Sequence, residues 1–217
     1  MRRSSNIAKL LKSTIQKFDI IELDGIFQVI LIQMDFLKRI DNYFTCFDEN
    51  KVIKLGIDIC TALEVIQKEN VMHRDIKPQN IFLSQDNNHF KLGDFGIAKY
   101  MESTSEVTRI GTELYISPEI YHSNVINANN NKVDMYSLGL VLYELMNNNR
   151  LPFQSQKYND HLERSKATHY RLLGKKIPPP IRGSDDLQTI VLKSCAYDSK
   201  DRFDDISQMR TALTGLT

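Results

Sequence analysis

The sequence predicts a single α+β domain dominated by helix, and three observations lead to this prediction. Apolar runs typical of strands come early in the chain, and segments with apolar residues at helical spacing follow them. The length of 217 residues suits one domain with a sizeable core. Charged residues make up 25% and hydrophobic residues 41% of the chain, the balance of an ordinary globular protein.

The first expected elements are two strands that form a hairpin over residues 19–36. Apolar runs at 20–23 and 26–34 flank Asp24-Gly25, a turn dipeptide favoured between twisted strands. A two-stranded hairpin is marginal in water, so it needs to pack on another element.

Residues 48–68 predict a helix, because apolar residues recur there at helical spacing behind the candidate start residues Asp48 and Asn50. Two short strands, 81–83 and 90–92, flank a polar turn. Residues 133–146 predict a buried helix. The remaining expected elements are exposed loops at 100–108 and 124–132, a proline connector at 178–180, and helices at 185–196 and 204–214.

Charge and cysteine usage exclude several classes of protein. The net charge of +1 gives no bulk field that favours nucleic acid or a membrane surface. The most apolar run, 133–146, is too short to span a membrane, and the N-terminus lacks the apolar stretch of a signal peptide. The cysteines, Cys46, Cys60 and Cys195, are odd in number and lack Cys-x-x-Cys spacing, which favours free thiols. We therefore expect a cytoplasmic protein that binds neither nucleic acid nor membranes.

The most informative runs are His73-Arg74-Asp75-Ile76-Lys77-Pro78-Gln79-Asn80 and Asp94-Phe95-Gly96. Alone, His73-Arg74-Asp75 could be a chance tripeptide, and Asp94-Phe95-Gly96 could be only a turn. Their order, and the strand–turn–strand unit between them, favour one functional unit. Together they resemble the catalytic loop and the metal-binding loop of a protein kinase, with the fold expected to be mainly the helical C-terminal lobe of that family.

The resemblance implies a role for each polar residue of these runs. Asp75 would accept or orient the proton of a substrate hydroxyl, and Lys77 would stabilise the phosphoryl group that ATP donates. Asn80 and Asp94 would hold Mg²⁺, which prefers oxygen ligands. The remaining motif members, His73, Phe95 and Gly96, would be structural.

Residues 111–119 resemble the end of a kinase activation segment, with Ser117 where the family usually has alanine, a departure of little chemical consequence. The resemblance implies that Asp134 braces the catalytic-loop backbone, although it could be an ordinary acid at a helix start. It also implies an ion pair between Glu119 and Arg202, which could instead be unrelated surface charges.

Two residues favour serine or threonine of a protein as the substrate by this resemblance: Lys77, and Thr112, which would contact both Asp75 and Lys77. A small-molecule kinase is the weaker alternative, because the 111–119 stretch shapes a platform for a peptide. Arg74 resembles the arginine of kinases that are activated by phosphorylation, although the loop could be ordered without it. The hydroxyls that could carry this phosphate are Ser103, Thr104, Ser105 and Thr108.

Residues 33–37 resemble the hinge that binds adenine through its backbone. Asp35 and Leu37 would offer backbone groups, and Phe82 would join the nucleotide site. Met34 would guard the back of the pocket, although plain core packing would explain it too.

The resemblance covers about residues 6–213. Residues 1–40 would be a residual N-terminal-lobe hairpin and hinge, and 41–217 the helical lobe. No Gly-x-Gly-x-x-Gly run and no matching strand lysine occur, so we expect the isolated chain to be weak or inactive, slower by on the order of 10⁴. It could be a truncated kinase, which we favour, a half-domain that pairs with an N-lobe-supplying or regulatory protein, or a pseudokinase-like interaction module.

Overall fold

A computed structural model of the chain describes residues 10–20, 25–34, 37–40, 48–86, 89–94, 113–123, 132–155 and 161–217. For the first two of these ranges it describes the backbone alone. The expected α+β class is confirmed, since helices dominate and two small antiparallel sheets accompany them. No helix in these ranges has the length and apolar character to cross a membrane.

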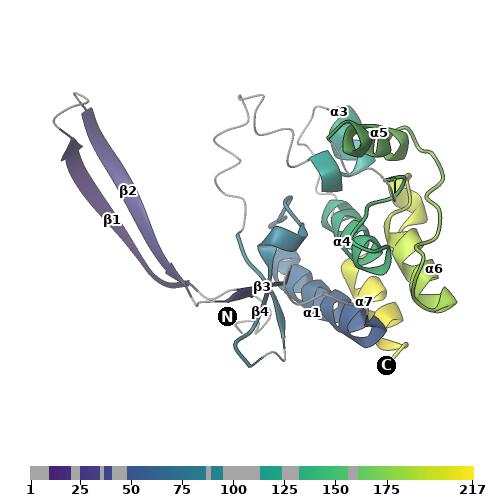
Figure 1. Cartoon of the computed structure of the whole chain (residues 1–217). Coiled ribbons are helices and arrows are strands. Elements are labelled where there is room, and N and C mark those ends of the chain that lie inside the picture. Colours follow the sequence, from purple (N-terminus) through teal and green to yellow (C-terminus); the bar gives the residue numbers. More distant parts are fainter. Residues whose placement is uncertain are drawn as a thin grey trace.

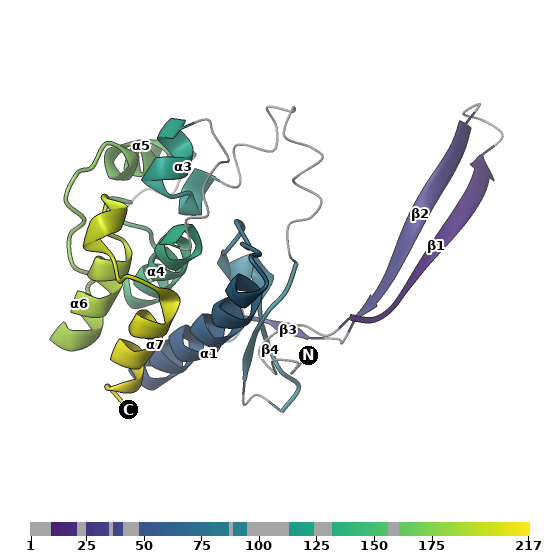
Figure 2. The ribbon, with the colours of Figure 1, turned by 180° about the vertical axis from the view of Figure 1, so that it is seen from behind.

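Four helices form the body of the molecule. Helix α1 (Glu49–Lys68) packs against α7 (Ile206–Thr214) and α4 (Lys132–Met146), and α4 packs in turn against α6 (Asp185–Ser194). Figure 1 shows α4 between α1 and α6, and Figure 2 shows α7 lying along α1 from the opposite side. Two further helices, α3 (Pro118–Ser123) and α5 (His161–Leu172), lie together at one end of this body.

The two longest helices differ in how they are buried. Helix α1 begins at Asp48, whose side chain accepts a hydrogen bond from the N–H of Lys51 at 3.2 Å, and one stripe of its surface is buried. Helix α4 is buried almost all round, with every residue from Val133 to Tyr143 in the interior. Its polar residues therefore need partners inside the protein, which the neighbouring loops supply.

A three-stranded antiparallel sheet lies beside α1, in the order β3 (Lys38–Arg39), β4 (Ile81–Leu83) and β5 (Phe90–Leu92). Ile81 and Leu83 are at most 2% exposed. Phe82, between them, faces the other side of the sheet and is half-buried. The N–H of Phe90 donates to Oδ2 of Asp58 at 2.8 Å, which fastens the sheet to α1.

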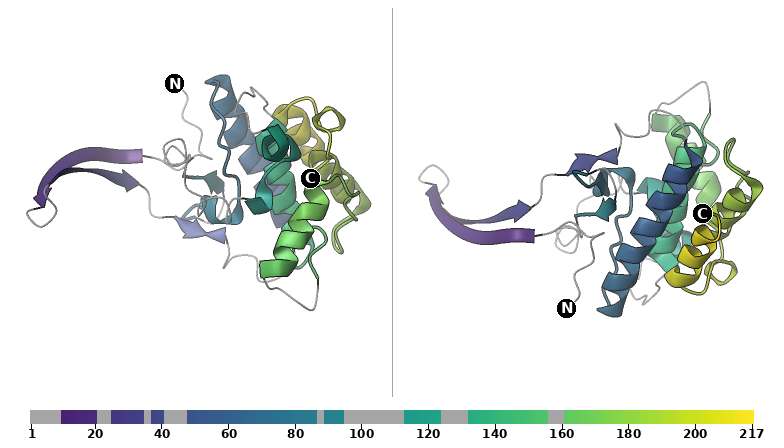
Figure 3. Two further views of the ribbon diagram at one scale, coloured as in Figure 1. Left: turned by 90° about the horizontal axis from the view of Figure 1, so that it is seen from above. Right: turned by 90° about the horizontal axis from the view of Figure 1, so that it is seen from below.

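A second, two-stranded sheet pairs β1 (Leu10–Ile20) with β2 (Gly25–Met34), and it projects away from the helical body in the views of Figure 3. Residues 21–24 lie outside the described part of the chain, so the expected turn at Asp24-Gly25 stays a prediction, and Gly25 is the first residue of β2. The expected first strand at 20–23 shares only Ile20 with β1, where Ile20 lies opposite Gly25. The strand is Leu10–Ile20, in which polar and apolar residues mix and leave no continuous apolar run.

Several elements were predicted well and others were missed. The expected helices at 48–68 and 133–146 and the strands at 81–83 and 90–92 are confirmed, whereas α6 and α7 are each shorter than predicted. Neither α3 nor α5 was predicted from the sequence. Helix α5 escaped notice because its buried face consists of Ala167, Thr168, Arg171 and Leu172, which give little apolar periodicity. The expected loop at 100–108 lies outside the described residues, and so does the expected loop at 124–132 except for Lys132, which begins α4.

Candidate active site

The loop from residue 73 to residue 80 is fastened to the first turn of α4. The buried Asp134 accepts hydrogen bonds from the backbone N–H groups of His73, at 2.9 Å, and Arg74, at 2.8 Å. Arg74 has a φ of 62°, a conformation that is unfavourable for a residue with a side chain. The carboxylate of Asp134 therefore stabilises a strained backbone, the bracing contact that the sequence analysis expected.

The His73 ring joins this loop to the segment that carries Asp94. Its Nδ1 accepts the N–H of Asp75 at 3.3 Å, and its Nε2 lies 3.1 Å from the carbonyl oxygen of Gly93. Both contacts are satisfied by a neutral ring that carries its proton on Nε2. Burial lowers the pKa of His73 and favours this neutral form, although the charge of Asp134 and the bond to Gly93 act in the opposite direction.

Three of the expected catalytic side chains meet at one carboxylate oxygen. Asp75 Oδ2 lies 3.0 Å from Nζ of Lys77 and accepts a hydrogen bond from Nδ2 of Asn80 at 2.9 Å. The same Nδ2 also donates to the backbone oxygen of Asp75 at 2.8 Å. Asp75 and Asn80 are 7% and 4% exposed, so their orientation is fixed by packing as well as by these bonds.

Asp94 lies next to Asn80 because of the pairing of β4 with β5. Ile81 opposes Leu92, and one step further the N–H of Gly93 donates to the backbone oxygen of Asn80 at 3.0 Å. Asp94 follows directly, with a φ of 56° and an exposed side chain. The strand pairing thus places a second carboxylate at the end of the sheet where Asn80 lies.

The donor atoms at this place fit a magnesium ion. Asn80 uses its amide nitrogen to bind Asp75, which leaves its Oδ1 as the atom suited to a cation. Asp94 offers carboxylate oxygens from an exposed position. Oxygen ligands from one amide and one carboxylate suit Mg²⁺, which completes its shell with waters and substrate phosphates.

The expected nucleotide residues are described only in part. Leu37 is half-buried and precedes β3, where Arg39 pairs with Phe82 of β4. Phe82 faces away from the helical core and is half-buried, and its part in the nucleotide site stays a prediction. Met34 ends β2, its side chain is not described, and Asp35 lies outside the described residues.

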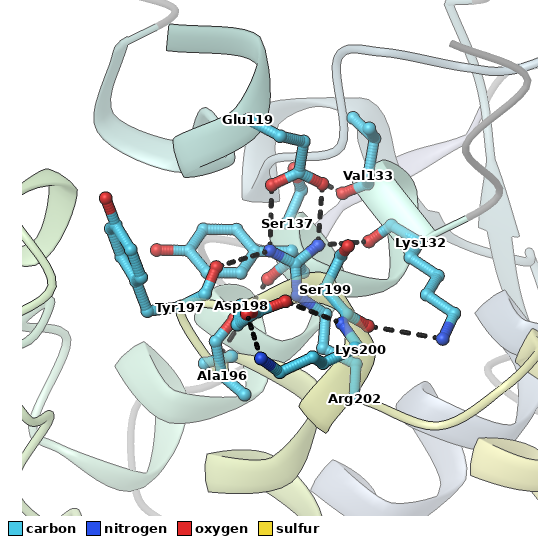
Figure 4. Close-up of polar contacts among 12 residues, drawn as sticks. Glu119, Lys132, Val133, Ser137, Ala196, Tyr197, Asp198, Ser199, Lys200 and Arg202 are labelled. Carbon is cyan, nitrogen blue, oxygen red and sulfur yellow. Dashed lines mark hydrogen bonds and ion pairs between the residues drawn. The ribbon is translucent and has the colours of Figure 1, made fainter. Parts of the chain in front are cut away.

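The expected ion pair between Glu119 and Arg202 is present and is shown in Figure 4. Both guanidinium Nη atoms donate to the Glu119 carboxylate at 2.8 Å, a bidentate geometry. The side chain of Arg202 is 0% exposed. Its remaining donor contacts go to backbone oxygens of neighbouring residues, namely Ala196 at 2.9 Å, Lys132 at 2.9 Å and Tyr197 at 3.2 Å.

Further contacts near Glu119 were missed by the sequence analysis. The Tyr115 hydroxyl donates to Glu144 at 2.6 Å, and Ser137 donates to the Tyr115 backbone oxygen. Burial raises the pKa of Glu144 and also that of Tyr115. Arg171 on α5 reaches the same segment. The only available signal was the presence of polar residues on buried helix faces, which must find partners.

Other expected site residues lie outside the described part of the chain, so their placement stays a prediction. Arg74 itself is exposed, as a phosphate-binding residue needs to be. Cys60 and Cys195 are buried free thiols, while Cys46 is not described. The undescribed site residues are Asp35, Phe95, Gly96, Ser103, Thr104, Ser105, Thr108 and Thr112.

Comparison with known proteins identifies the family. The family model of the protein kinase domain matches residues 3–212. The chain is 45% identical over 114 residues, 51% of its length, to the mouse serine/threonine-protein kinase Nek1. It is 36% identical over 161 residues, 72% of its length, to a probable serine/threonine-protein kinase, nek3, of Dictyostelium discoideum. It is 34% identical over 171 residues, 75% of its length, to the serine/threonine-protein kinase PknB of Mycolicibacterium smegmatis.

These matches cover only part of each relative, namely 9% of Nek1, 13% of nek3 and 26% of PknB. The family match nevertheless extends over nearly the whole chain. The chain therefore belongs to the protein kinase family, among relatives that are serine/threonine kinases.

Proposed function

We propose that this chain carries the catalytic groups of a protein kinase that transfers the γ-phosphoryl group of ATP to serine or threonine of a protein. One observation carries the proposal. The side chains of Lys77 and Asn80 both lie within 3.0 Å of Oδ2 of Asp75, and the β4–β5 pairing places Asp94 beside Asn80. This is an arrangement for positioning and charge stabilisation, which is most of what phosphoryl transfer needs.

Each side chain has one task in the proposed reaction. Asp75 orients the substrate hydroxyl and accepts its proton as the oxygen bonds to phosphorus. Lys77, held at the same carboxylate, offsets the negative charge on the transferred phosphoryl group while the bond between this group and ADP breaks. Asn80 and Asp94 hold Mg²⁺ through oxygen atoms. The bound metal supplies positive charge at the phosphates.

The nucleotide and the regulatory phosphate have proposed binding groups as well. Backbone groups of Asp35 and Leu37 bind adenine, with Met34 and Phe82 bounding its pocket. Arg74 is exposed beside the catalytic loop, where its guanidinium is suited to pair with a phosphorylated hydroxyl. The proposed hydroxyls are Ser103, Thr104, Ser105 and Thr108, and Thr112 is proposed to contact Asp75 and Lys77.

We keep the proposed division into a hairpin and hinge at residues 1–40 and a helical lobe at 41–217. The sequence contains no glycine-rich phosphate loop. An N-lobe-supplying or regulatory protein is one of the proposed partners, beside the protein substrate and ATP. The cytoplasm is the proposed compartment, because it supplies ATP and keeps the buried thiols of Cys60 and Cys195 reduced.

Magnesium-dependent ATP binding, measured by calorimetry, tests the nucleotide half of the proposal. We expect the chain to bind Mg-ATP, and Asp94→Asn to abolish the metal-dependent part by removing a charged ligand. Asp75→Asn should leave ATP binding in place. Asp198→Asn is the matched control, because Asp198 pairs with Lys200 and is far from Asp94 in the sequence. No metal-dependent binding by the folded chain would contradict the proposal and favour a non-catalytic interaction module.

Transfer of labelled phosphate from ATP to a Ser/Thr peptide library tests the chemistry. We expect slow transfer by the chain and its loss in Asp75→Asn, in spite of intact ATP binding. Tyrosine-containing peptides should accept no label. Transfer that survives Asp75→Asn would show that a contaminating kinase or another residue performs the reaction.

A further inference from the structure

Residues 114–117, which we call the platform segment, are held through their backbone carbonyl groups. Three successive carbonyl oxygens accept hydrogen bonds from side chains of α4 and α5, and two of the three bonds come from Arg171 alone. The bonds run from Arg171 Nη2 to Leu114 O at 3.0 Å, from Ser137 Oγ to Tyr115 O at 2.8 Å, and from Arg171 Nη1 to Ile116 O at 2.7 Å.

Arg171 is itself firmly fixed. It lies in the last turn of α5 and is only 3% exposed. Its Nη1 also donates to the Tyr136 hydroxyl at 2.6 Å, and its guanidinium lies 5.4 Å from the centre of the Tyr136 ring. The guanidinium of Arg202 also lies over this ring, 4.7 Å from its centre. A planar guanidinium can bridge two carbonyls and a phenol, which a lysine ammonium on its flexible stem cannot reproduce.

Holding the carbonyl groups also determines where the amide N–H groups point. In a trans peptide the C=O and N–H bonds point in opposite directions, and none of the described peptide bonds is cis. The carbonyls of residues 114–116 face Arg171 and Ser137. The N–H groups of Tyr115, Ile116 and Ser117 therefore point away from the side chains that bind these carbonyls.

Exposure alternates along the platform segment in the same sense. Tyr115 is 8% exposed and Ser117 is 0% exposed, so both are buried. Leu114 and Ile116 are only half-buried. The two residues whose carbonyls Arg171 binds are thus the two that keep part of their side chains at the surface.

We propose that Arg171 is a positioning residue for the protein substrate. By holding the Leu114 and Ile116 carbonyls, it fixes the peptide planes and the apolar side chains of the surface on which the substrate backbone lies. The inference rests on the proposed function and extends it, because it assigns part of the substrate selection to α5. The guanidinium of Arg171 binds Leu114, Ile116 and Tyr136, so its effect should fall on the peptide and spare the nucleotide.

The test compares Arg171→Gln and Arg171→Lys with the wild-type chain on an array of degenerate Ser/Thr peptides. Arg210→Gln is the matched control, because it breaks an arginine–carboxylate contact with Glu64 that joins α7 to α1. Both Arg171 variants should bind the peptides at least about tenfold more weakly and lose the wild-type preference next to the phosphorylated residue. Their Mg-ATP affinity should stay within about twofold of wild type.

Two further readouts separate positioning from a general structural role. In transfer assays the KM for peptide should rise while the KM for ATP is unchanged. Hydrogen exchange of the amides at 115–117 should accelerate in both Arg171 variants and stay at the wild-type rate in Arg210→Gln. If Arg171→Gln does not fold, Arg171→Lys and Tyr136→Phe, which removes only the phenol oxygen, provide the comparison.

The outcomes distinguish the inference from the proposed function. A folded Arg171 variant with wild-type peptide affinity and preference overturns the inference and leaves the proposed function standing. Weaker peptide binding together with unchanged exchange at 115–117 also overturns it. A wild-type chain that binds Mg-ATP but selects and phosphorylates no peptide overturns the proposed function, and the assignment of Arg171 to the substrate with it.

Discussion

The catalytic loop and the platform segment are both fastened to helix α4, but with opposite polarity. The loop is held by its N–H groups, which donate to the carboxylate of Asp134. The platform segment is held by its C=O groups, which accept from Ser137 and from the guanidinium of Arg171. One buried helix thus positions the chemical groups and the proposed substrate surface by different kinds of bond.

Because different kinds of group hold the two regions, the two should respond differently to pH. The catalytic side depends on a carboxylate and on a neutral histidine, two groups whose charge changes with pH. The platform side, including the Glu119–Arg202 pair behind it, depends on guanidinium groups, which keep their charge throughout the usual pH range. The catalytic side should therefore be the more sensitive to acid through His73, whereas the guanidinium contacts of the platform side should change little with pH.

The largest expected effect is that of Arg202→Gln, because it leaves the Glu119 carboxylate without its bidentate partner and removes donors from three backbone oxygens. Loss of one partner of a buried ion pair should destabilise the fold by about 3–5 kcal/mol. Urea unfolding measures the change. Lys200→Gln, which alters an exposed pair with Asp198 in the same loop, should leave stability close to that of the wild type. Equal effects of the two variants would contradict this view of Arg202.

A smaller effect is expected for Asp134→Asn on the catalytic side. The amide can accept one hydrogen bond through its oxygen, but its NH₂ group meets the second backbone N–H of the His73–Arg74 pair. We expect a loss of about 2–3 kcal/mol, since a charged acceptor is lost and a buried donor is left unpaired. Asp205→Asn is the control, because Asp205 is the N-cap of α7 and asparagine serves equally well at an N-cap. Stability loss in the control but not in Asp134→Asn would reverse the expected ranking.

The third prediction concerns acid and His73. Burial lowers the pKa of His73 below its ordinary value of 6.5, so the unfolded chain takes up this proton at higher pH than the folded chain. The stability that the neutral ring contributes is present above pH 6.5 and is lost as the pH falls toward the lowered value. Unfolding free energies of wild type and His73→Gln should therefore converge as the pH falls from 7.5.

Taking the difference between the two proteins reports on His73 together with Asp134, because each of these groups acts on the pKa of the other. Burial raises the pKa values of Asp134 and Glu144, so these groups act in the opposite sense and favour the folded state as the pH falls. The stability difference between wild type and Arg202→Gln should show no comparable convergence. A constant difference for His73→Gln across this range would mean that the ring is not held neutral.

The sequence allowed the secondary structure to be predicted where local patterns are strong. Helix α4 is the most apolar run of the chain and α1 has a clear stripe with a capping aspartate, so both were found. Helix α5 was missed because its buried face depends on Arg171, a residue that sequence patterns assign to the surface. The limits of β1 were wrong because its mixed pattern gives no strand signal.

The site required information that local patterns do not contain. The contacts between His73 and Asp134 and between Glu119 and Arg202 join residues 61 and 83 positions apart. They were expected only through family resemblance. The contact between Arg171 and Ile116, 55 positions apart, had no such guide. Side-chain-to-carbonyl bonds leave no trace in the residue types of the accepting segment, because every residue has a carbonyl group.

The smallest expected effect, and the only stabilising one, comes from Ser117, which ends the platform segment. Its hydroxyl is buried and has no hydrogen-bond partner in the part of the chain that the structure describes. Ser117→Ala removes an unsatisfied polar atom with little change of volume, so we expect a gain of about 0.5–1 kcal/mol in urea unfolding. Ser137→Ala is the contrasting control. It should destabilise the protein, because it removes the donor to the Tyr115 carbonyl. A loss of stability in Ser117→Ala would show that the hydroxyl has a partner in the folded protein, and that the platform segment is held by a fourth side-chain contact.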